Sequence, residues 1–448
     1  MLLEFQTKNY KSFKDTMVFS MIPAPKQKDL EYSILKEKTM GTEHKALSSA
    51  VIYGPNASGK TNIIGAMDTF KAIVLRGSIK NDKDVKTPNI AANLLELVPN
   101  NLSMDSDPVE FHIKFIEDNF LITYGLIVDL GTFLDKDFDR RIICEYLEIN
   151  DELIYKRDAE LQLGENAVIQ KYMKDVVFEN LFSAKTLSES NLNEKELFLT
   201  NGFKTIFSSE LAELILNWVK NKFVIIYRAD AISLVSPISD GEDNAIYLEK
   251  TLTEAAECFG ITSNGLGYMK NDDEHKTKLY SFVESKNEKA AIPIEMFESY
   301  GTVRFVNLFP LIVGAMKRGA TLVIDEFDAS IHPMALMNIV NIFHNDDVNV
   351  QNAQLIFNTH NPIFLNANLF RRDEIKFVER DAETHYSTHY SLSDFKTSGK
   401  YGVRKGEDYM KKYFISQYGA INDIDFTPVF ENVLGLGEGE QYGDENDN

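Results

Sequence analysis

The chain has 448 residues, of which 44% are hydrophobic, and its 68 acidic against 47 basic side chains give a formal net charge of −21. This length predicts two or three structural units, or one large domain with an insertion, and the acidic balance disfavours unspecific nucleic-acid binding, although a local basic groove is compatible with it. The longest apolar stretch, 303–316, is short and contains Arg304 and Asn307, so it is not a bilayer span. With two cysteines and no signal-peptide layout at the N-terminus, we expect a soluble, cytoplasmic protein without a membrane partner.

The first structural signals are two predicted strands within residues 2–22, joined by Asn9-Tyr10-Lys11-Ser12-Phe13-Lys14, and a polar loop is predicted at 23–45. An apolar run at 50–53 then predicts a short buried strand, and a helix is predicted to begin at residue 62. Between this strand and helix lies Gly-x-x-x-x-Gly-Lys-Thr, at residues 54–61. A glycine loop in this context binds nucleotide phosphates, because its backbone N–H groups and the helix N-terminus point at the phosphate oxygens.

The last two residues of this loop, Lys60 and Thr61, each have a predicted role. We expect Lys60 to reach the β- and γ-phosphates of ATP and the Thr61 hydroxyl to ligate Mg²⁺. The alternative interpretation is a glycine-rich turn that binds nothing. The residues predicted to contact the nucleotide here are Gly54, Pro55, Asn56, Ala57, Ser58, Gly59, Lys60, Thr61 and Asn62.

The middle of the chain changes from strand to helix patterns. Strand-like runs at 109–116, 120–129 and 141–149 are separated by turn residues, so they predict an antiparallel layer close to the nucleotide strand. From about 160 to 220 apolar residues recur at helical spacing, which predicts a helical insertion. Further predictions are a return strand at 223–227, a loop at 236–244, a helix at 245–259 and a surface hairpin within 264–293.

A second half of the site is predicted at residues 321–326, where an apolar strand ends in Asp325 and Glu326. Asp325 is expected to hold Mg²⁺ through water as the partner of Thr61, and Glu326, on the other side of the strand end, to orient and polarise the attacking water. The alternative is a strand that runs into an ordinary acidic loop.

Two histidines follow this strand. A further strand, 354–360, ends in Thr359 and His360, and if it is parallel to the first, His360 lies beside the γ-phosphate. The plainer interpretation of His360 is a loop histidine. For His332 we expect a structural role, in stacking or capping.

The segment Asn9–Phe13, the phosphate loop, Asp325-Glu326, Asp328 and His360 together resemble the ATP-binding-cassette head domain. The resemblance is to its soluble branch, the RecF-like, chromosome-maintenance and OLD ATPases, and above all to AAA-type ATP-binding proteins of the RloA and abortive-infection kind. It covers roughly 1–140 and 296–425, and it implies that Asp328 also contributes to nucleotide binding.

In such heads a Ser-x-Gly signature opens a helix and contacts the γ-phosphate bound by the other protomer. Ser299-Tyr300-Gly301 precedes the helical run 303–316, so the resemblance implies this role for Ser299 and Gly301. An ordinary helix N-cap is the alternative, and the two roles are compatible. The family's glutamine loop cannot be assigned, since the only glutamines between Thr61 and the signature, Gln162 and Gln170, lie in the predicted insertion.

The sequence therefore predicts an α/β fold, an ATP-binding-cassette head of the P-loop type with a mixed sheet and an antiparallel β layer, interrupted by a mainly helical insertion. The predicted parts are an N-lobe at 1–150, the insertion at 151–295, a C-lobe at 296–437 and a disordered acidic tail at 438–448.

The predicted function is Mg-ATP hydrolysis with Lys60, Glu326 and His360 as catalytic residues and Thr61 and Asp325 as metal ligands. The resemblance implies an ATP-dependent homodimer or higher homo-oligomer that acts as the sensor ATPase of a prokaryotic anti-phage or toxin-like system. Its partner is then a separate effector protein, such as a nuclease. The alternatives are a RecF-like DNA-repair ATPase, with nucleic acid as its partner, and a nucleotide-gated scaffold that scarcely hydrolyses ATP.

Overall fold

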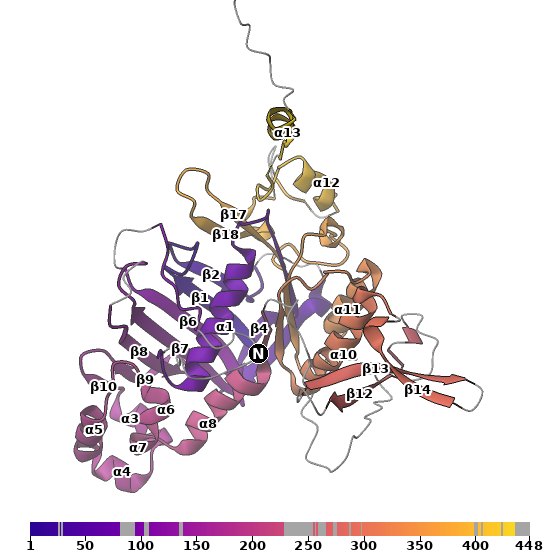
Figure 1. Cartoon of the computed structure of the whole chain (residues 1–448). Coiled ribbons are helices and arrows are strands. Elements are labelled where there is room, and N and C mark those ends of the chain that lie inside the picture. The colour runs from indigo at the N-terminus through magenta and orange to yellow at the C-terminus, as the bar shows by residue number, and fades with distance from the viewer. Residues whose placement is uncertain are drawn as a thin grey trace, which may run out of the picture.

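Two large sheets form the body of the molecule in a computed structural model (Figure 1). The structure describes residues 1–25, 27, 30–80, 95–102, 107–133, 138–227, 254–255, 257–258, 266–271, 276–285, 288–296, 298–397, 402–404, 406–422 and 424–434. The predicted loop at 236–244, most of the predicted helix at 245–259 and the predicted tail at 438–448 lie outside these residues.

The first sheet has six strands in the order β11-β15-β16-β5-β17-β18, all parallel except the last pair. Every residue of β5, β15 and β16 is buried, as expected for central parallel strands that are covered on both faces. The carboxyl ends of the parallel strands therefore meet at one edge of this core sheet. The strands are β5 (Ser49–Tyr53), β11 (Phe223–Ile226), β15 (Thr321–Ile324), β16 (Gln354–Asn358), β17 (Ile375–Arg380) and β18 (Ser387–Ser391).

The second sheet is antiparallel, with seven strands in the order β10-β9-β8-β7-β6-β1-β2. The predicted strands at 109–116, 120–129 and 141–149 are confirmed as β6, β7 and β8, within one residue at each end. The strands are β1 (Leu2–Lys8), β2 (Met17–Ser20), β6 (Val109–Glu117), β7 (Phe120–Asp129), β8 (Arg141–Ile149), β9 (Glu152–Arg157) and β10 (Leu161–Leu163).

The predicted loop at 23–45 is wrong in its second half, which forms a two-stranded hairpin of β3 (Ile34–Thr39) and β4 (Thr42–Leu47). Only a minority of the residues in these strands are buried, and Lys and Glu fill most of the exposed positions. A charged, half-solvated hairpin lacks the apolar alternation by which strands are identified in a sequence.

Helices cover both faces of the core sheet. Along β5, Ala50 and Ile52 pack into a core shared with α1 (Lys60–Arg76) and the antiparallel sheet. Val51 and Tyr53 point to the opposite face, where the core includes α10 (Tyr300–Arg318) and α11 (Pro333–His344).

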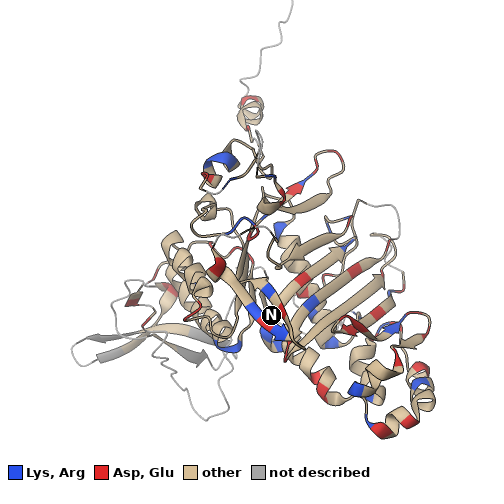
Figure 2. Ribbon diagram, turned by 180° about the vertical axis from the view of Figure 1, so that it is seen from behind, with Lys and Arg blue, Asp and Glu red and all other residues tan. Residues whose placement is uncertain are grey.

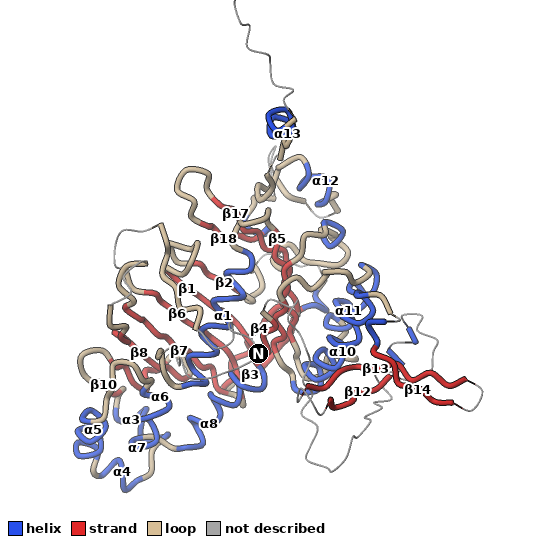
Figure 3. The backbone as a smooth tube through the Cα atoms, in the orientation of Figure 1, coloured by secondary structure: helices blue, strands red, loops and turns tan. Residues whose placement is uncertain are grey.

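Residues 151–295 contribute to both sheets as well as holding helices (Figure 3). Strands β9 and β10 extend the antiparallel sheet, β11 is an edge strand of the core sheet, and the predicted hairpin within 264–293 is a small three-stranded sheet. The helices α3 to α8 lie in the first half of this range, between Asn166 and Asn217. The elements are α3 (Asn166–Ile169), α4 (Asp175–Glu179), α5 (Leu181–Ser190), α6 (Phe198–Asn201), α7 (Phe203–Ile206), α8 (Ser209–Asn217), a π turn (Trp218–Lys222), β12 (Leu266–Asn271), β13 (Lys276–Ser285) and β14 (Glu288–Pro293).

The described chain ends in two short helices, α12 (Tyr409–Phe414) and α13 (Thr427–Val433). Both lie at the β17–β18 end of the molecule, with α13 farther from the body than α12 (Figure 1). Among the described residues, no helix combines the length and the apolar character that crossing a bilayer requires.

Candidate nucleotide-binding site

The phosphate loop connects β5 to α1 at the carboxyl edge of the core sheet. Neither of its two glycines, Gly54 and Gly59, can be replaced without strain. A Cβ on Gly54 would lie 2.3 Å from the carbonyl oxygen of Val378 in β17. Gly59 has φ of +111°, and a Cβ there would lie within 2.8 Å of the hydroxyls of Ser387 and Ser12. Because Gly59 is also the N-cap of α1, no side chain caps the first N–H groups of this helix.

Lys60 is held inside the loop. Its Nζ donates to the carbonyl oxygens of Gly54 (2.8 Å) and Pro55 (3.0 Å), and the side chain is buried. Burial lowers the pKa of Lys60 to about 8, against the opposing effect of nearby carboxylates, Asp325 first among them. The ammonium group thus lies in the centre of the loop that the sequence predicts to bind phosphates.

The two halves of the predicted site meet. The Thr61 hydroxyl donates to Oδ1 of Asp325 over 3.2 Å, although the two residues are 264 positions apart in the chain. Asp325 is buried at the end of β15, where its N–H donates to the carbonyl of Ile226 in the adjacent strand β11. Parallel pairing of β15, β16 and β5 brings these distant segments to one edge.

The chemistry of these two side chains fits a magnesium ion. A hydroxyl and a carboxylate are hard oxygen donors, which Mg²⁺ prefers, and it binds ATPase sites through one or two such groups and the substrate phosphates. Thr61 and Asp325 are the residues that would hold it. The chemistry that it would supply there is positive charge opposite the phosphate groups of the nucleotide.

Asn358, which the sequence analysis did not single out, holds the Asp325 carboxylate and the backbone of Glu326. Its Nδ2 donates to Oδ1 of Asp325 (2.5 Å), and its Oδ1 accepts from the backbone N–H of Glu326. In the β15–β16 register Phe357 pairs with Ile324, so Asn358 lies opposite Asp325. The only signal in the sequence is a polar residue at the end of a buried strand, and its meaning depends on the register.

Glu326 has a strained backbone and an exposed side chain. Its φ of +51° lies in the left-handed region, which costs a non-glycine residue on the order of 1 kcal/mol or more. In addition to the bond from its N–H to Asn358, its carbonyl accepts from Nη2 of Arg304 in α10 (2.5 Å). These two bonds fix the direction in which the Glu326 carboxylate leaves the strand end. The structure therefore assigns a positioning role to Arg304, which the sequence did not indicate.

His360 and Asp328 share the electrostatic environment of Lys60. Packing around the imidazole and the positive charge of Lys60 lower the pKa of His360, while Asp328 and Asp325 oppose the shift. Asp328 is half-buried and also acts on Lys60. Lys60, Asp325, Asp328 and His360 thus lie close enough to act on one another electrostatically.

Comparison with known proteins agrees with this geometry. Residues 49–366, more than half of the chain, match the family described as "AAA domain, putative AbiEii toxin, Type IV TA system". The chain belongs to this family. The match begins at β5 and ends shortly after His360, so this AAA domain includes both halves of the site. The family relates the chain to abortive infection and gives it an AAA-type P-loop ATPase domain. No curated protein matches the chain.

In the AAA domain the predicted signature is the start of α10. Ser299 is the helix N-cap, and its hydroxyl accepts from the N–H of Thr302 over 3.2 Å. Gly301 is buried against the loop that follows β15, where a Cβ would lie only 1.9 Å from the carbonyl oxygen of Ser330. The cap interpretation of Ser299 is confirmed, and the contact of Ser299 and Gly301 with a second protomer stays a prediction. His332 caps α11, as expected, by accepting from the N–H of Met334.

The other predicted contact residues lie on the loop surface or against neighbouring segments. Asn56 and Ala57 are exposed, and Ala57 adopts a positive φ of 63°, whereas Ser58 is buried. Asn62 donates to the Ser12 hydroxyl (2.7 Å), which ties α1 to the Asn9–Phe13 turn.

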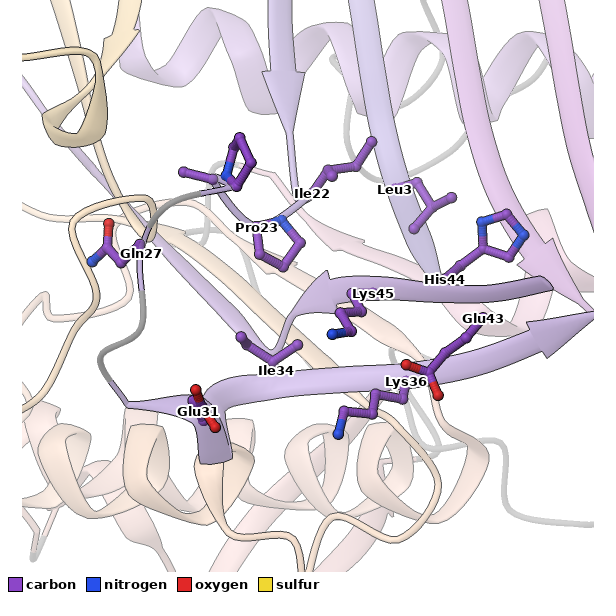
Figure 4. Close-up of a pocket in the computed structure, with 12 residues that line it drawn as sticks. Leu3, Ile22, Pro23, Gln27, Glu31, Ile34, Lys36, Glu43, His44 and Lys45 are labelled. Carbon is purple, nitrogen blue, oxygen red and sulfur yellow. The ribbon is translucent and has the colours of Figure 1, made fainter.

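A separate pocket of about 480 Å³ lies between the β3–β4 hairpin and residues 22–25 and 27 (Figure 4). Its lining carries charges of both signs, Lys36 and Lys45 beside Glu31 and Glu43. Neither the phosphate loop nor Asp325 lines this pocket, so it is distinct from the nucleotide-binding site of the AAA domain.

Proposed function

We propose that this protein is a Mg-ATP-dependent ATPase that hydrolyses ATP to ADP and phosphate. The hydrogen bond between Thr61 and Asp325 is the observation that carries this proposal, because it joins a phosphate loop to the acidic end of a distant parallel strand. Lys60 directly precedes Thr61 in the chain and is buried within the loop.

In the proposed reaction the protein mainly positions and stabilises charge. Lys60 and the backbone N–H groups of residues 54–61 stabilise the negative charge on the transferred phosphoryl group. Glu326 orients the attacking water and accepts its proton, with its backbone held by Asn358 and Arg304. His360, beside Lys60, contacts the γ-phosphate.

The proposal extends to an ATP-dependent dimer that regulates a separate effector in prokaryotic anti-phage defence. Ser299, exposed at the start of α10, and Gly301 serve the nucleotide of a second copy. The type IV toxin–antitoxin description of the family supports an effector partner. In Figure 2 blue and red segments alternate over the antiparallel sheet and helices α3–α8, and this charge pattern favours a protein effector over a nucleic-acid duplex.

Two variants test the proposed reaction. Lys60→Ala should weaken ATP binding, measured by calorimetry, by about tenfold or more. Glu326→Gln should keep ATP affinity but lower phosphate release by about 100-fold or more, since general-base catalysis typically contributes this much. Glu179→Gln, on the exposed face of α4, is the matched control and should change neither quantity.

Either of two results would contradict the reaction. Lys60→Ala that binds ATP as tightly as the parent would show that the loop is not the nucleotide site. Glu326→Gln that releases phosphate at the parent's rate would leave a nucleotide-gated scaffold as the better account.

A further inference from the structure

A half-buried tyrosine lies beside both halves of the proposed magnesium site. Tyr227 directly follows β11, the edge strand that pairs with β15. The carbonyl of its neighbour Ile226 accepts a hydrogen bond from the N–H of Asp325 over 2.9 Å. Tyr227 therefore continues the backbone segment to which the Asp325 half of the site is bonded.

The ring of Tyr227 packs on α1, the helix that carries the other half. A Cβ on Gly65 would lie 3.1 Å from two atoms of the Tyr227 side chain, Cζ and the hydroxyl oxygen, so the tyrosine lies directly against this glycine. Gly65 comes one helical turn after Thr61, and residues four positions apart lie on the same face of a helix. One side chain thus contacts the helix that presents Thr61 and extends from the strand that holds Asp325.

An ion pair holds the hydroxyl of Tyr227. The hydroxyl donates to Oε2 of Glu96 (2.9 Å), and Nζ of Lys11 donates to the same carboxylate oxygen (2.5 Å) and to the hydroxyl (3.3 Å). Nζ of Lys11 also lies 5.6 Å from the centre of the Tyr227 ring. The side chains of Lys11 and Glu96 are only 16% and 19% exposed, so solvent screens this pair less than it would screen a pair on the surface.

Main-chain bonds fix Lys11 in turn. Its N–H donates to the carbonyl of Val98 (3.1 Å), and its carbonyl accepts from Nδ2 of Asn100 (2.7 Å). Lys11 belongs to the turn between β1 and β2 of the antiparallel sheet, whereas Tyr227 follows a strand of the core sheet. The cluster of Lys11, Glu96 and Tyr227 therefore connects the two sheets beside the metal site.

We propose that Tyr227, held by Lys11 and Glu96, is a positioning residue that fixes Thr61 relative to Asp325 and thereby sets how much Mg²⁺ adds to the affinity for ATP. This role rests on the proposed Mg-ATP site and extends that site beyond the phosphate loop and the acidic strand end. Mg²⁺ demands near-ideal octahedral geometry, so a small displacement of one ligand weakens its binding. Groups that orient metal ligands are typically worth about 10- to 100-fold in metal affinity or activity.

Calorimetry measures the contribution of the metal directly. In the Glu326→Gln background, the ATP dissociation constant in EDTA divided by that in Mg²⁺ gives the gain from the metal. Tyr227→Phe keeps the ring on Gly65 and removes the bonds of the hydroxyl, so this gain should fall by about tenfold, while the affinity in EDTA stays within about threefold of the parent's. A loss of folded protein would lower the number of binding sites but not this ratio, so the ratio distinguishes positioning from stability.

Tyr390→Phe is the matched control. The Tyr390 hydroxyl also donates to a carboxylate, that of Glu379 (3.1 Å), and to a carbonyl, that of Tyr418 (2.7 Å). Its strand, β18, lies at the opposite edge of the core sheet from β11. This variant should leave the gain from magnesium unchanged.

Two further variants test the cluster from its two sides. Glu96→Gln removes the charge that holds the hydroxyl, so the gain should fall, and adding Tyr227→Phe should cause no loss beyond that of the weaker single variant, because both act through one bond. Gly65→Ala adds a Cβ from which the tyrosine must move away. It should also lower the gain, although alanine is the better helix former.

The outcomes separate this role from the function on which it rests. If the parent gains affinity from Mg²⁺ and Tyr227→Phe gains as much, the positioning role is wrong and the proposed metal site stands. Equal losses of the gain in Tyr227→Phe and Tyr390→Phe would show a general loosening of the fold and would also overturn the role. If the parent gains nothing from Mg²⁺, the proposed metal site and the role of Tyr227 are both wrong.

Discussion

Lys60 occupies an environment that makes its charge depend on pH in an accessible range. Its pKa of about 8 in the nucleotide-free protein means that the ammonium form dominates at pH 7 and is lost as the pH rises toward 9. Phosphates favour the charged form, so we expect ATP affinity to fall between pH 7 and 9 and ATP binding near pH 8 to take up protons. Calorimetry at pH 8 in two buffers that differ in ionisation enthalpy measures this uptake.

Lys60→Arg is the control for this titration, because a guanidinium stays charged over the whole range. Its binding should take up no protons near pH 8, whatever its affinity. An unchanged ATP affinity of the parent from pH 7 to 9 would show that Lys60 does not titrate where its buried position indicates.

At the scale of single residues, the sequence predicted the site residues that belong to a motif. It did not predict the residues that hold the motif residues in position. Lys60, Thr61 and Asp325 were predictable because fixed spacing and strand context define their chemistry. Asn358 and Arg304 were not, since an asparagine at a strand end and an arginine within an apolar helix acquire their roles only from strand register and helix packing. From the sequence alone, Arg304 indicates only that the apolar stretch 303–316 does not cross a bilayer.

At the scale of elements, the start of α10 depends on one glycine. A Cβ on Gly301 would lie 1.9 Å from the Ser330 carbonyl oxygen, and backbone cannot yield as a flexible side chain can. Gly301→Ala should therefore displace Ser299 and the first turn of α10 from the loop after β15. We expect phosphate release to fall by about tenfold or more, while ATP affinity, set by Lys60 in the same chain, stays within about threefold.

Gly314→Ala provides a matched control within the same helix. A Cβ there would approach only the flexible end of Arg318, at 3.1 Å, and alanine favours helix over glycine by about 1 kcal/mol. This variant should keep its activity and be at least as stable as the parent. Full turnover of Gly301→Ala would show that the start of α10 has no part in the reaction.

The predicted elements were correct where apolar periodicity was strong. Strands β6, β7 and β8 alternate or run continuously apolar, and the sequence located each within one residue. The β3–β4 hairpin was missed because charged residues fill it. The position of β11 beside β15 was beyond sequence reasoning, since strand order depends on which edge of the sheet remains available.

At the scale of the whole molecule, the buried amide of Gln354 is one of the contacts that join the two large sheets. Gln354, at the start of β16, accepts from the Leu2 N–H (2.6 Å) and the Thr321 hydroxyl (2.9 Å). Its Nε2 donates to the carbonyls of Leu2 and Leu47, both at 3.0 Å. The N-terminal strand of the antiparallel sheet is thereby fixed to the core sheet 352 positions away. One glutamine carries no periodic signal, so the sequence could predict both sheets but not this joint between them.

Removing this amide should weaken the fold by loosening the connection between the two sheets. Gln354→Ala leaves several buried donors and acceptors without a partner, and each costs about 1–3 kcal/mol, so we expect the free energy of unfolding to fall by about 3 kcal/mol or more. Gln162→Ala, at an exposed position in β10, should change it by less than about 0.5 kcal/mol.

Urea unfolding followed by two probes distinguishes a joint from a local contact. The only tryptophan, Trp218, stacks on Phe115 with ring centroids 3.8 Å apart, so its fluorescence reports on the core beneath the antiparallel sheet. Far-ultraviolet circular dichroism reports on the whole chain. If Gln354 couples the sheets, Gln354→Ala should separate two transitions that coincide in the parent. A variant whose transitions still coincide, at the urea concentration of Gln162→Ala, would show that the sheets are held together without this side chain.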